Sequence, residues 1–354
     1  MGKEAGAFEN RRLAEAPSLS DGWNVFDKTT RFLTDRMPLR REAVRANTRI
    51  SRDLFDTNPR YGQAGDDRGL PFAGGGQAPQ RAAPGRGAEA SQVVRGRGGW
   101  LFLGEERRRS CTPDYPRELA FERWRELVSR VRASGRRSVL VVPPDKYTIY
   151  PENLPTDAAT ARCAKLGQDA FWRLLDQAPR SAGLVGLREP LLRLKRSQRE
   201  RVYLKTDTHW TNRGGLELVR GALGELSPRV RVAPSDVVSQ GRPTGPGDLN
   251  GLLGDSTTER REVLAIKRRR GAPRVPGRTL FVLDSFGNAM LHLLPPYFEQ
   301  FETAFWTATP RAELAAKIKR ADNVIFESVE REFGFRASDK GPVTEDLLRR
   351  LPGR

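Results

Sequence analysis

Two short polar segments of the sequence could together supply a nucleophile and the base that activates it. They are Asp207-Thr208-His209-Trp210 and Asp284-Ser285-Phe286-Gly287. A serine hydroxyl becomes a useful nucleophile only when a base takes its proton, and the usual base is a neutral imidazole held by a carboxylate. Asp207 and His209 are two residues apart, so in extended backbone their side chains point the same way. The spacing therefore predicts that Asp207 orients His209, and that His209 is the base for Ser285.

Each segment also has an ordinary structural interpretation. A histidine after a strand is more often a hydrogen-bonding residue than a catalyst, and Asp-Ser at a strand-to-helix turn is commonly an N-cap. If Ser285 begins a helix, its own N–H and that of Phe286 point outward and could bind an oxyanion, aided by the helix dipole. His292 lies among leucines in the same predicted helix and is expected to pack there without a chemical role. On the residues alone, these alternatives stay open.

Both polar segments follow apolar runs of strand length, residues 201–204 and residues 279–283. In α/β sheets, catalytic groups lie in turns just past the carboxyl ends of strands. Hydrophobic periodicity predicts the other elements: helices over 117–134, 158–177, 212–226, 285 to about 294 and 312–320, and strands over 100–103, 138–142 and 323–326. Strands that alternate with helices indicate an α/β fold, a mostly parallel sheet with helices on both faces.

The composition changes along the chain and suggests three parts. Residues 1–56 have helical character and are predicted to form an N-terminal helical extension. More than half of residues 57–91 are Gly, Ala or Pro, without periodicity, as in a linker or a long surface loop. Residues 92–354 hold the α/β domain, in which 228–278 is irregular and is expected to contain insertions.

The overall composition excludes several classes of protein. Two cysteines and two histidines exclude a zinc-cluster protein and leave little room for a histidine metal site, so no metal and no cofactor are expected. The formal net charge is +18, but the basic residues are spread along the whole chain and no nucleic-acid motif occurs, so nucleic acid is not the expected partner. No apolar run reaches the length of a membrane span, and no signal peptide is visible.

Several motifs occur together in order along the chain. They are ENRRLAEAP, DRMPLRREAVRAN, GRGGWLFL, VVPPDKYTIYPENLP, YLKTDTHWTNRGGLEL, GDLNGLLG, LDSFGNAMLHLLPPYFEQF and ADNVIFESVERE. This set resembles the alginate O-acetyltransferase family of the AlgX and AlgJ type, which has an SGNH-hydrolase-like domain. The DTHW and DSFG elements, about 75 residues apart, are the specific part of the resemblance. The fold expected from it is SGNH-hydrolase-like, which is flavodoxin-like in its sheet.

The resemblance implies a catalytic triad of Asp207, His209 and Ser285 that acetylates hydroxyls of an exported polysaccharide. It also implies an acetyl donor delivered by a membrane-bound O-acyltransferase partner, and a location outside the cytoplasmic membrane, periplasmic or at the cell surface. A membrane anchor is then expected upstream of the ENR element. Two other functions stay open: a carbohydrate acetylesterase on the same triad, and a non-catalytic scaffold of a polysaccharide export complex.

Two basic residues are predicted to contact an acidic polysaccharide. Lys146 follows the strand that ends before Pro143-Pro144, and Arg213 follows the DTHW segment. Because the carboxyl ends of parallel strands meet at one edge of a sheet, both could border the same cleft as Ser285. The alternative is that both are ordinary solvated charges. If Lys146 lines the cleft, reversing its charge should weaken acceptor use more than hydrolysis of a small neutral ester.

The two cysteines offer a separate test of location. Cys111 and Cys163 lie in polar surroundings, and in an extracytoplasmic protein a disulfide between them is expected. The alternative is a pair of buried free thiols, each acting as a small apolar side chain.

Overall fold

The computed structural model describes residues 93–155, 158–197 and 201–351. The chain forms two compact units, one of Met1–Val94 with Asp248–Ser256, the other of Arg95–Gly247 with Thr257–Arg354. Helix α10 (Asp248–Leu252) belongs to the first unit. The second unit holds the sheet and both polar segments. The predicted extension over 1–56 and linker over 57–91 lie outside the described residues, so these boundaries stay predictions.

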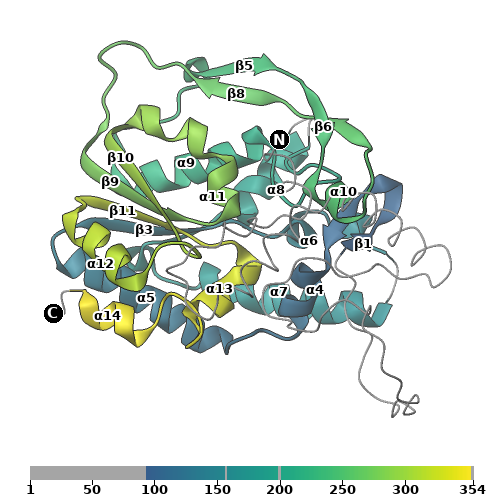
Figure 1. The fold of residues 1–354 in the computed structure, drawn as a ribbon, viewed down its shortest axis with the longest axis horizontal. Coiled ribbons are helices and arrows are strands. Elements are labelled where there is room, and N and C mark those ends of the chain that lie inside the picture. The colour runs from purple at the N-terminus through teal and green to yellow at the C-terminus, as the bar shows by residue number, and fades with distance from the viewer. Residues whose placement is uncertain (1–92, 156–157, 198–200, 352–354) are drawn as a thin grey trace, which may run out of the picture. The chain divides into compact units, whose positions relative to one another are not determined.

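A five-stranded parallel sheet forms the centre of the second unit (Figure 1). Its spatial order is β10-β9-β11-β3-β4, with the strands β3 (Arg137–Val142), β4 (Leu184–Gly186), β9 (Val275–Leu283), β10 (Phe298–Phe305) and β11 (Asn323–Glu327). Every pairing in the sheet is parallel. The central strands are near-continuous apolar runs because both faces of the sheet are covered. The mostly parallel α/β sheet expected from the sequence is confirmed.

Helices cover both faces of this sheet, as Figure 1 shows. One face packs against α5 (Arg117–Ala133), α7 (Ala158–Asp176), α12 (Arg311–Arg320), α13 (Glu330–Ala337) and α14 (Glu345–Arg350). The opposite face carries α9 (Asn212–Leu226) and α11 (Ser285–Ala289). Alternate residues of the strands, for example Leu140 and Val142 of β3, contribute to the hydrophobic core between the sheet and the first group of helices. The remaining helices are α4 (Gly104–Cys111), α6 (Lys146–Ile149) and α8 (Arg188–Ser197).

The segment predicted to be irregular, 228–278, contains two antiparallel strand pairs. One joins β5 (Val237–Gly241) to β8 (Val263–Ile266), and the other joins β6 (Thr244–Pro246) to β7 (Thr258–Arg260). The short strands β1 (Val93–Arg95) and β2 (Leu101–Leu103) precede α4. The strand predicted over 100–103 is confirmed as β2. Periodicity does not reveal β1 or the strands of the two pairs, because each offers too few residues to establish an alternation.

Two predicted elements differ from the structure. Residues 201–204 do not form a strand of the sheet: Tyr203 pairs only with Trp210, in an isolated antiparallel bridge. The helix that begins at Ser285 ends at Ala289 rather than near 294, and a short 3₁₀ turn follows it. The helix over 212–226 is confirmed, and its expected N-cap Thr211 accepts a hydrogen bond from Gly214 N at 3.3 Å.

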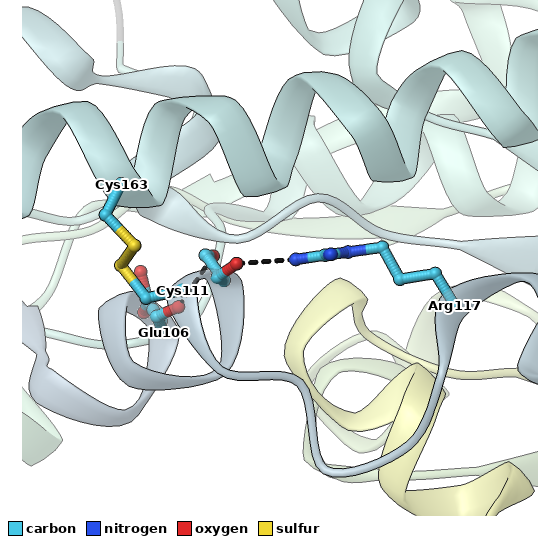
Figure 2. Close-up of a disulfide and its surroundings, with 5 residues drawn as sticks. Glu106, Cys111, Arg117 and Cys163 are labelled. Carbon is cyan, nitrogen blue, oxygen red and sulfur yellow. Dashed lines mark hydrogen bonds between the residues drawn. A yellow bond between two sulfur atoms is a disulfide. The ribbon is translucent and has the colours of Figure 1, made fainter.

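The predicted disulfide is present and joins α4 to α7 (Figure 2). The Cα atoms of Cys111 and Cys163 lie 5.3 Å apart, within the range that a disulfide requires. Arg117 Nη2 donates to the carbonyl oxygen of Ser110 at 2.6 Å, next to the bridge. The end of α4 is therefore fixed by a covalent bond and by a hydrogen bond. None of the helices in the described ranges combines the length and apolar character that a membrane span needs.

Candidate active site

The carboxyl ends of the three central strands bring polar residues to one edge of the sheet. Phe326 of β11 pairs with Val282 of β9, and Glu327 pairs with Val141 of β3, so the three strands end together. Asp145 follows β3 and Asp284 follows β9, as the edge argument predicts. In α/β folds, ligands and catalytic groups lie at this edge of the sheet.

The loop that carries Asp207 and His209 closes on itself instead of following a strand. We call residues 202–211 the histidine loop. Thr211 N donates to Val202 O at 2.9 Å, and Tyr203 pairs with Trp210. These contacts join the two ends of the loop, so that the residues between them form a compact turn. The prediction of a strand over 201–204 is therefore wrong. The apolar residues of this segment are nevertheless buried, inside the loop.

Asp207 and His209 form a hydrogen-bonded pair inside this loop. Oδ1 of Asp207 accepts from the backbone N–H of His209 and lies 2.9 Å from its Nδ1. With the proton on Nδ1, the imidazole keeps Nε2 as its basic nitrogen, which is the tautomer a general base requires. Burial raises the pKa of Asp207, but the hydrogen bonds and charge of His209, with the charge of Arg261, outweigh burial and lower this pKa to about 2. Asp207 is therefore ionised and able to orient the ring.

The second polar segment, residues 284–287, forms a tight turn at the end of β9, here called the serine turn. Ser285 begins α11 and its side chain is exposed. Asp284 is the N-cap, and its Oδ1 accepts from Phe286 N at 2.8 Å. The N–H of Phe286, expected to contribute to an oxyanion hole, is engaged by this cap. That part of the expectation is wrong, because the carboxylate of the N-cap competes for the same donor.

Phe286 connects the serine turn to the histidine loop. Trp210 Nε1 donates to the carbonyl oxygen of Phe286 at 3.2 Å, in a buried hydrogen bond. The ring of Phe286 lies 5.1 Å from the His209 ring and 5.4 Å from the Trp210 ring, measured between centroids. Two segments that are far apart in the sequence are thus packed together, with the exposed Ser285 next to the residue that joins them.

Lys146 does not border an open cleft. Its side chain is fully buried, and Nζ donates to the carbonyl oxygens of Leu204, Lys205 and Asp207 at 3.2, 3.3 and 2.6 Å. In this structure an acceptor sugar cannot reach the ammonium, so the acceptor contact predicted for Lys146 is replaced by contacts with the histidine loop. The position of Lys146 after the end of β3 agrees with the prediction, but the burial of its side chain was not predicted.

Arg213, the second predicted acceptor contact, lies in the first turn of α9 and pairs with Glu262. Its Nε lies 2.6 Å and its Nη2 3.0 Å from the two carboxylate oxygens of Glu262. The guanidinium thus forms a forked ion pair with a carboxylate of the protein itself, in place of the predicted contact with an acidic polysaccharide. The Arg213 side chain remains partly exposed, at 34%.

A set of buried charged residues lies next to the histidine loop and the serine turn, and sequence patterns do not reveal that these residues meet. Arg331 donates to Asp145 Oδ1 at 2.6 Å, and its guanidinium lies 5.1 Å from the centre of the Phe286 ring. Asp145 N donates to Glu330 Oε2 at 2.9 Å. Burial and then the charge of Asp145 raise the pKa of Glu330 to about 8. The sequence signal for this cluster is the pair of motifs VPPDK and ER, because Asp145, Glu330 and Arg331 belong to them.

A second pair of acidic residues, Glu327 and Asp284, holds the serine turn in place. Glu327 Oε2 accepts from Asp284 N at 2.8 Å, and burial, followed by the charge of Asp284, raises the pKa of Glu327 well above its usual range. Asp284 Oδ2 accepts from Val329 N and from Arg336, each at 3.1 Å. Both carboxyl groups thus hold the serine turn, at which Ser285 is exposed.

Comparison with known proteins gives matches to part of the chain. The family model described as the SGNH hydrolase-like domain of the acetyltransferase AlgX matches residues 93–257. A probable alginate O-acetylase AlgJ of Pseudomonas aeruginosa is 30% identical over 199 residues, which cover 52% of this chain and 48% of the relative. The probable AlgJ of Pseudomonas fluorescens is 31% identical over 122 residues, 34% of this chain and 30% of the relative. The chain spans less than half the length of these curated relatives.

Among solved structures, the chain is similar to the O-acetyltransferase domain of Pseudomonas putida AlgJ. The two are 19% identical, with a TM-score of 0.46, over 73% of this chain and 98% of that one. The family resemblance inferred from the motifs is confirmed by the sequence matches.

Proposed function

We propose that this chain, which carries the SGNH hydrolase-like domain of AlgX-type acetyltransferases over residues 93–257, is a polysaccharide O-acetyltransferase that acts through Ser285, His209 and Asp207. The observation that carries the proposal is the Asp207–His209 pair, joined through Phe286 to the turn that bears an exposed serine. An ionised carboxylate, an oriented imidazole and a hydroxyl are the three groups that nucleophilic acyl transfer uses.

In the first half of the reaction, Ser285 Oγ attacks the carbonyl carbon of the acetyl donor while His209 Nε2 takes the hydroxyl proton. The tetrahedral intermediate then expels the donor alcohol, which receives that proton from His209, and an acetyl-serine ester remains. In the second half, His209 takes a proton from a sugar hydroxyl, whose oxygen attacks the ester. The acetyl sugar leaves and Ser285 regains its proton. Asp207 stabilises the imidazolium in both halves.

The proposed acceptor is an exported polysaccharide, and the proposed place of action is outside the cytoplasmic membrane. The relatives are named alginate O-acetylases, which supports a polysaccharide acceptor but leaves the polymer open for this chain. The Cys111–Cys163 disulfide supports the location, because such bonds persist in oxidising compartments. The acetyl group is proposed to arrive through a membrane-bound O-acyltransferase partner. Membrane association through an N-terminal anchor belongs to the same proposal.

The closest alternative function uses the same triad with water as the acceptor. Such a carbohydrate acetylesterase would share the acetyl-serine intermediate, and only the second half of the reaction would differ. The exposed position of Ser285 favours this alternative, because bulk water has access to the nucleophile. A non-catalytic scaffold would need neither the Asp207–His209 pair nor a reactive serine.

A single assay distinguishes these functions. The protein is incubated with 4-nitrophenyl acetate, with and without oligosaccharides of several acidic and neutral polymers, and both nitrophenol release and acetylated sugar are measured. A transferase forms acetylated sugar, an esterase releases acetate only, and a scaffold does neither. Ser285→Ala should abolish release and labelling of the protein by a serine-directed sulfonyl fluoride. Release that Ser285→Ala leaves unchanged would contradict the proposed triad.

A further inference from the structure

We propose that Lys146 and Glu259 are positioning residues for the Asp207–His209 pair, acting on the backbone of the histidine loop from two sides. The inference rests on the proposed function, because it concerns the base of that reaction. Neither side chain is expected to touch substrate, so neither is a catalytic residue.

Lys146 binds the carbonyl groups of the loop. Its Nζ is within 3.3 Å of three acceptors along the turn, the carbonyl oxygens of Leu204, Lys205 and Asp207. The ammonium also faces the rings of Trp100 and Phe102, 5.9 and 5.4 Å from their centres. A fully buried ammonium is costly unless such partners surround it. The shortest of the contacts is made to Asp207 itself, at 2.6 Å.

Glu259 binds the amide groups of the same turn. Its Oε2 accepts from Lys205 N at 3.1 Å, and its Oε1 accepts from Thr206 N at 3.0 Å and from Thr206 Oγ1 at 2.9 Å. Glu259 lies on β7, which pairs with β6, so it comes from an element that the sequence analysis treated as irregular. Its side chain is only 10% exposed. Charge-assisted bonds of this kind are stronger than neutral ones.

The chain also packs closely against the loop at Gly247. A Cβ atom at this position would lie 1.9 Å from the carbonyl oxygen of Thr206, so no larger residue fits there without movement. The carbonyl groups of residues 204–207 are therefore held by a cation and by close packing, and the amide groups by an anion. Because the backbone of Asp207 is fixed in this way, its Oδ1 is held 2.9 Å from His209 Nδ1.

The test uses a property of the chain that is independent of turnover. The protein has only two histidines, so NMR titration of the imidazoles gives one curve for His209 and an internal control from His292. Within the second unit, Arg261 acts on Asp207 through its charge, and Lys146 and Glu259 bind the backbone of the loop. Loosening Asp207 weakens its attraction for the imidazolium, so Glu259→Gln should lower the measured pKa of His209 by about 1 unit.

The same variant should reduce kcat for 4-nitrophenyl acetate by about 10–100-fold with little change in KM, because geometry and not binding is altered. The matched control is Glu299→Gln, since Glu299 also accepts a backbone N–H, that of Gly277, at the opposite end of β9. This control should leave both histidine curves and kcat unchanged. Lys146→Met, which removes the cation at similar volume, should shift His209 in the same direction.

Glutamine has nearly the shape of glutamate and keeps one side-chain oxygen as an acceptor. The Glu259→Gln protein is therefore expected to show the His292 titration curve and the circular dichroism spectrum of the wild type. With the fold kept, an unchanged His209 titration in Glu259→Gln would overturn the inference. The titration decides this even if Ser285→Ala remains active. The positioning of His209 and the identity of the nucleophile are therefore tested separately.

Discussion

Trp210 donates a buried hydrogen bond to the carbonyl oxygen of Phe286, 76 residues further along the chain. This bond joins the histidine loop, which bears the proposed base, to the serine turn, which bears the proposed nucleophile. Phe286 directly follows Ser285, so we expect a shift of Trp210 to move the proposed nucleophile as well. The relation predicts that the indole N–H matters for activity as well as for stability.

Trp210→Phe tests that relation, because phenylalanine keeps an aromatic ring but cannot donate to the Phe286 carbonyl. Loss of this bond should lower the free energy of unfolding by about 1–3 kcal/mol, since a buried carbonyl loses its partner. The kcat for a chromogenic acetyl ester should fall more than the stability loss alone explains. Urea denaturation and steady-state kinetics measure the two effects. The control is Trp124→Phe, which removes a buried hydrogen bond of the same kind, from the indole of Trp124 on α5 to the carbonyl oxygen of Phe333 on α13. Equal activity in Trp210→Phe and wild type would mean that the two turns keep their arrangement without this bond.

Asp207→Asn tests the orientation of the base. Asparagine is close in shape, but its amide can hold the imidazole in the wrong tautomer, with the proton on Nε2. Ester hydrolysis is expected to fall by about 10³–10⁴-fold while the melting temperature changes little. The pKa of Asp207 is lowered to about 2, so the wild-type carboxylate stays ionised throughout the usual assay range. Activity of the wild type should therefore show no acidic limb from Asp207 above about pH 3, and such a limb would contradict the ionised pair.

The central sheet could be predicted from the sequence because its strands are buried on both faces. The apolar runs at 138–142 and 323–326 are strands β3 and β11, and no other element of that length needs such continuous apolar character. Strand β10 was missed because it lies at the edge of the sheet and exposes Glu299 and Gln300, which interrupt the apolar pattern. The strand β4 at the other edge has only three residues and was missed as well, because so short a strand gives a weak signal.

The pairing of Asp207 with His209 could be predicted from the sequence, but the residues that hold the pair could not. Asp207 and His209 are two residues apart, so local spacing predicted their pairing. Lys146 was predicted to line a cleft and contact the acceptor, because sequence patterns do not show that three carbonyl groups surround it. Glu259 lies in a segment without periodicity, and its contacts with residues 205 and 206 depend on long-range folding.

Breaking the disulfide should destabilise the protein without removing activity. The bridge joins residues 52 apart, and loops of this size are stabilised by about 2–4 kcal/mol. Cys111→Ser/Cys163→Ser should therefore melt at a lower temperature, and a reducing agent should lower the melting temperature of the wild type but not of the double variant. The bridge lies between α4 and α7 and not on either turn, so kcat for the chromogenic ester should stay within about twofold at 25 °C. A large loss of kcat in the folded double variant would show that α4 also controls the site.

Glu106→Gln should change how stability depends on pH. Glu106 is fully buried on α4, its Oε2 accepts from Tyr147 N at 3.1 Å, and Oε1 has no hydrogen-bond partner within the described part of the chain. Burial, and then the charge of Asp145, raise the pKa of Glu106 to about 8. A carboxyl group whose pKa is raised by folding binds its proton more tightly in the folded state. It therefore stabilises the fold fully below about pH 4.5, and this contribution is lost as the pH rises toward 8.

Glutamine resembles the protonated carboxyl and has no proton to lose, so Glu106→Gln should be less sensitive to the rise from pH 5 to pH 8. The difference in free energy of unfolding, wild type minus variant, is expected to decrease steadily over this range. Urea denaturation at half-unit pH steps measures it, and Glu122→Gln, an exposed carboxyl on α5, should follow the wild type at every pH. A difference between Glu106→Gln and wild type that stays constant from pH 5 to pH 8 would mean that Glu106 is already ionised in the folded protein. The buried carboxyl would then have to draw more stabilisation from Arg331 and Lys146 than its burial removes.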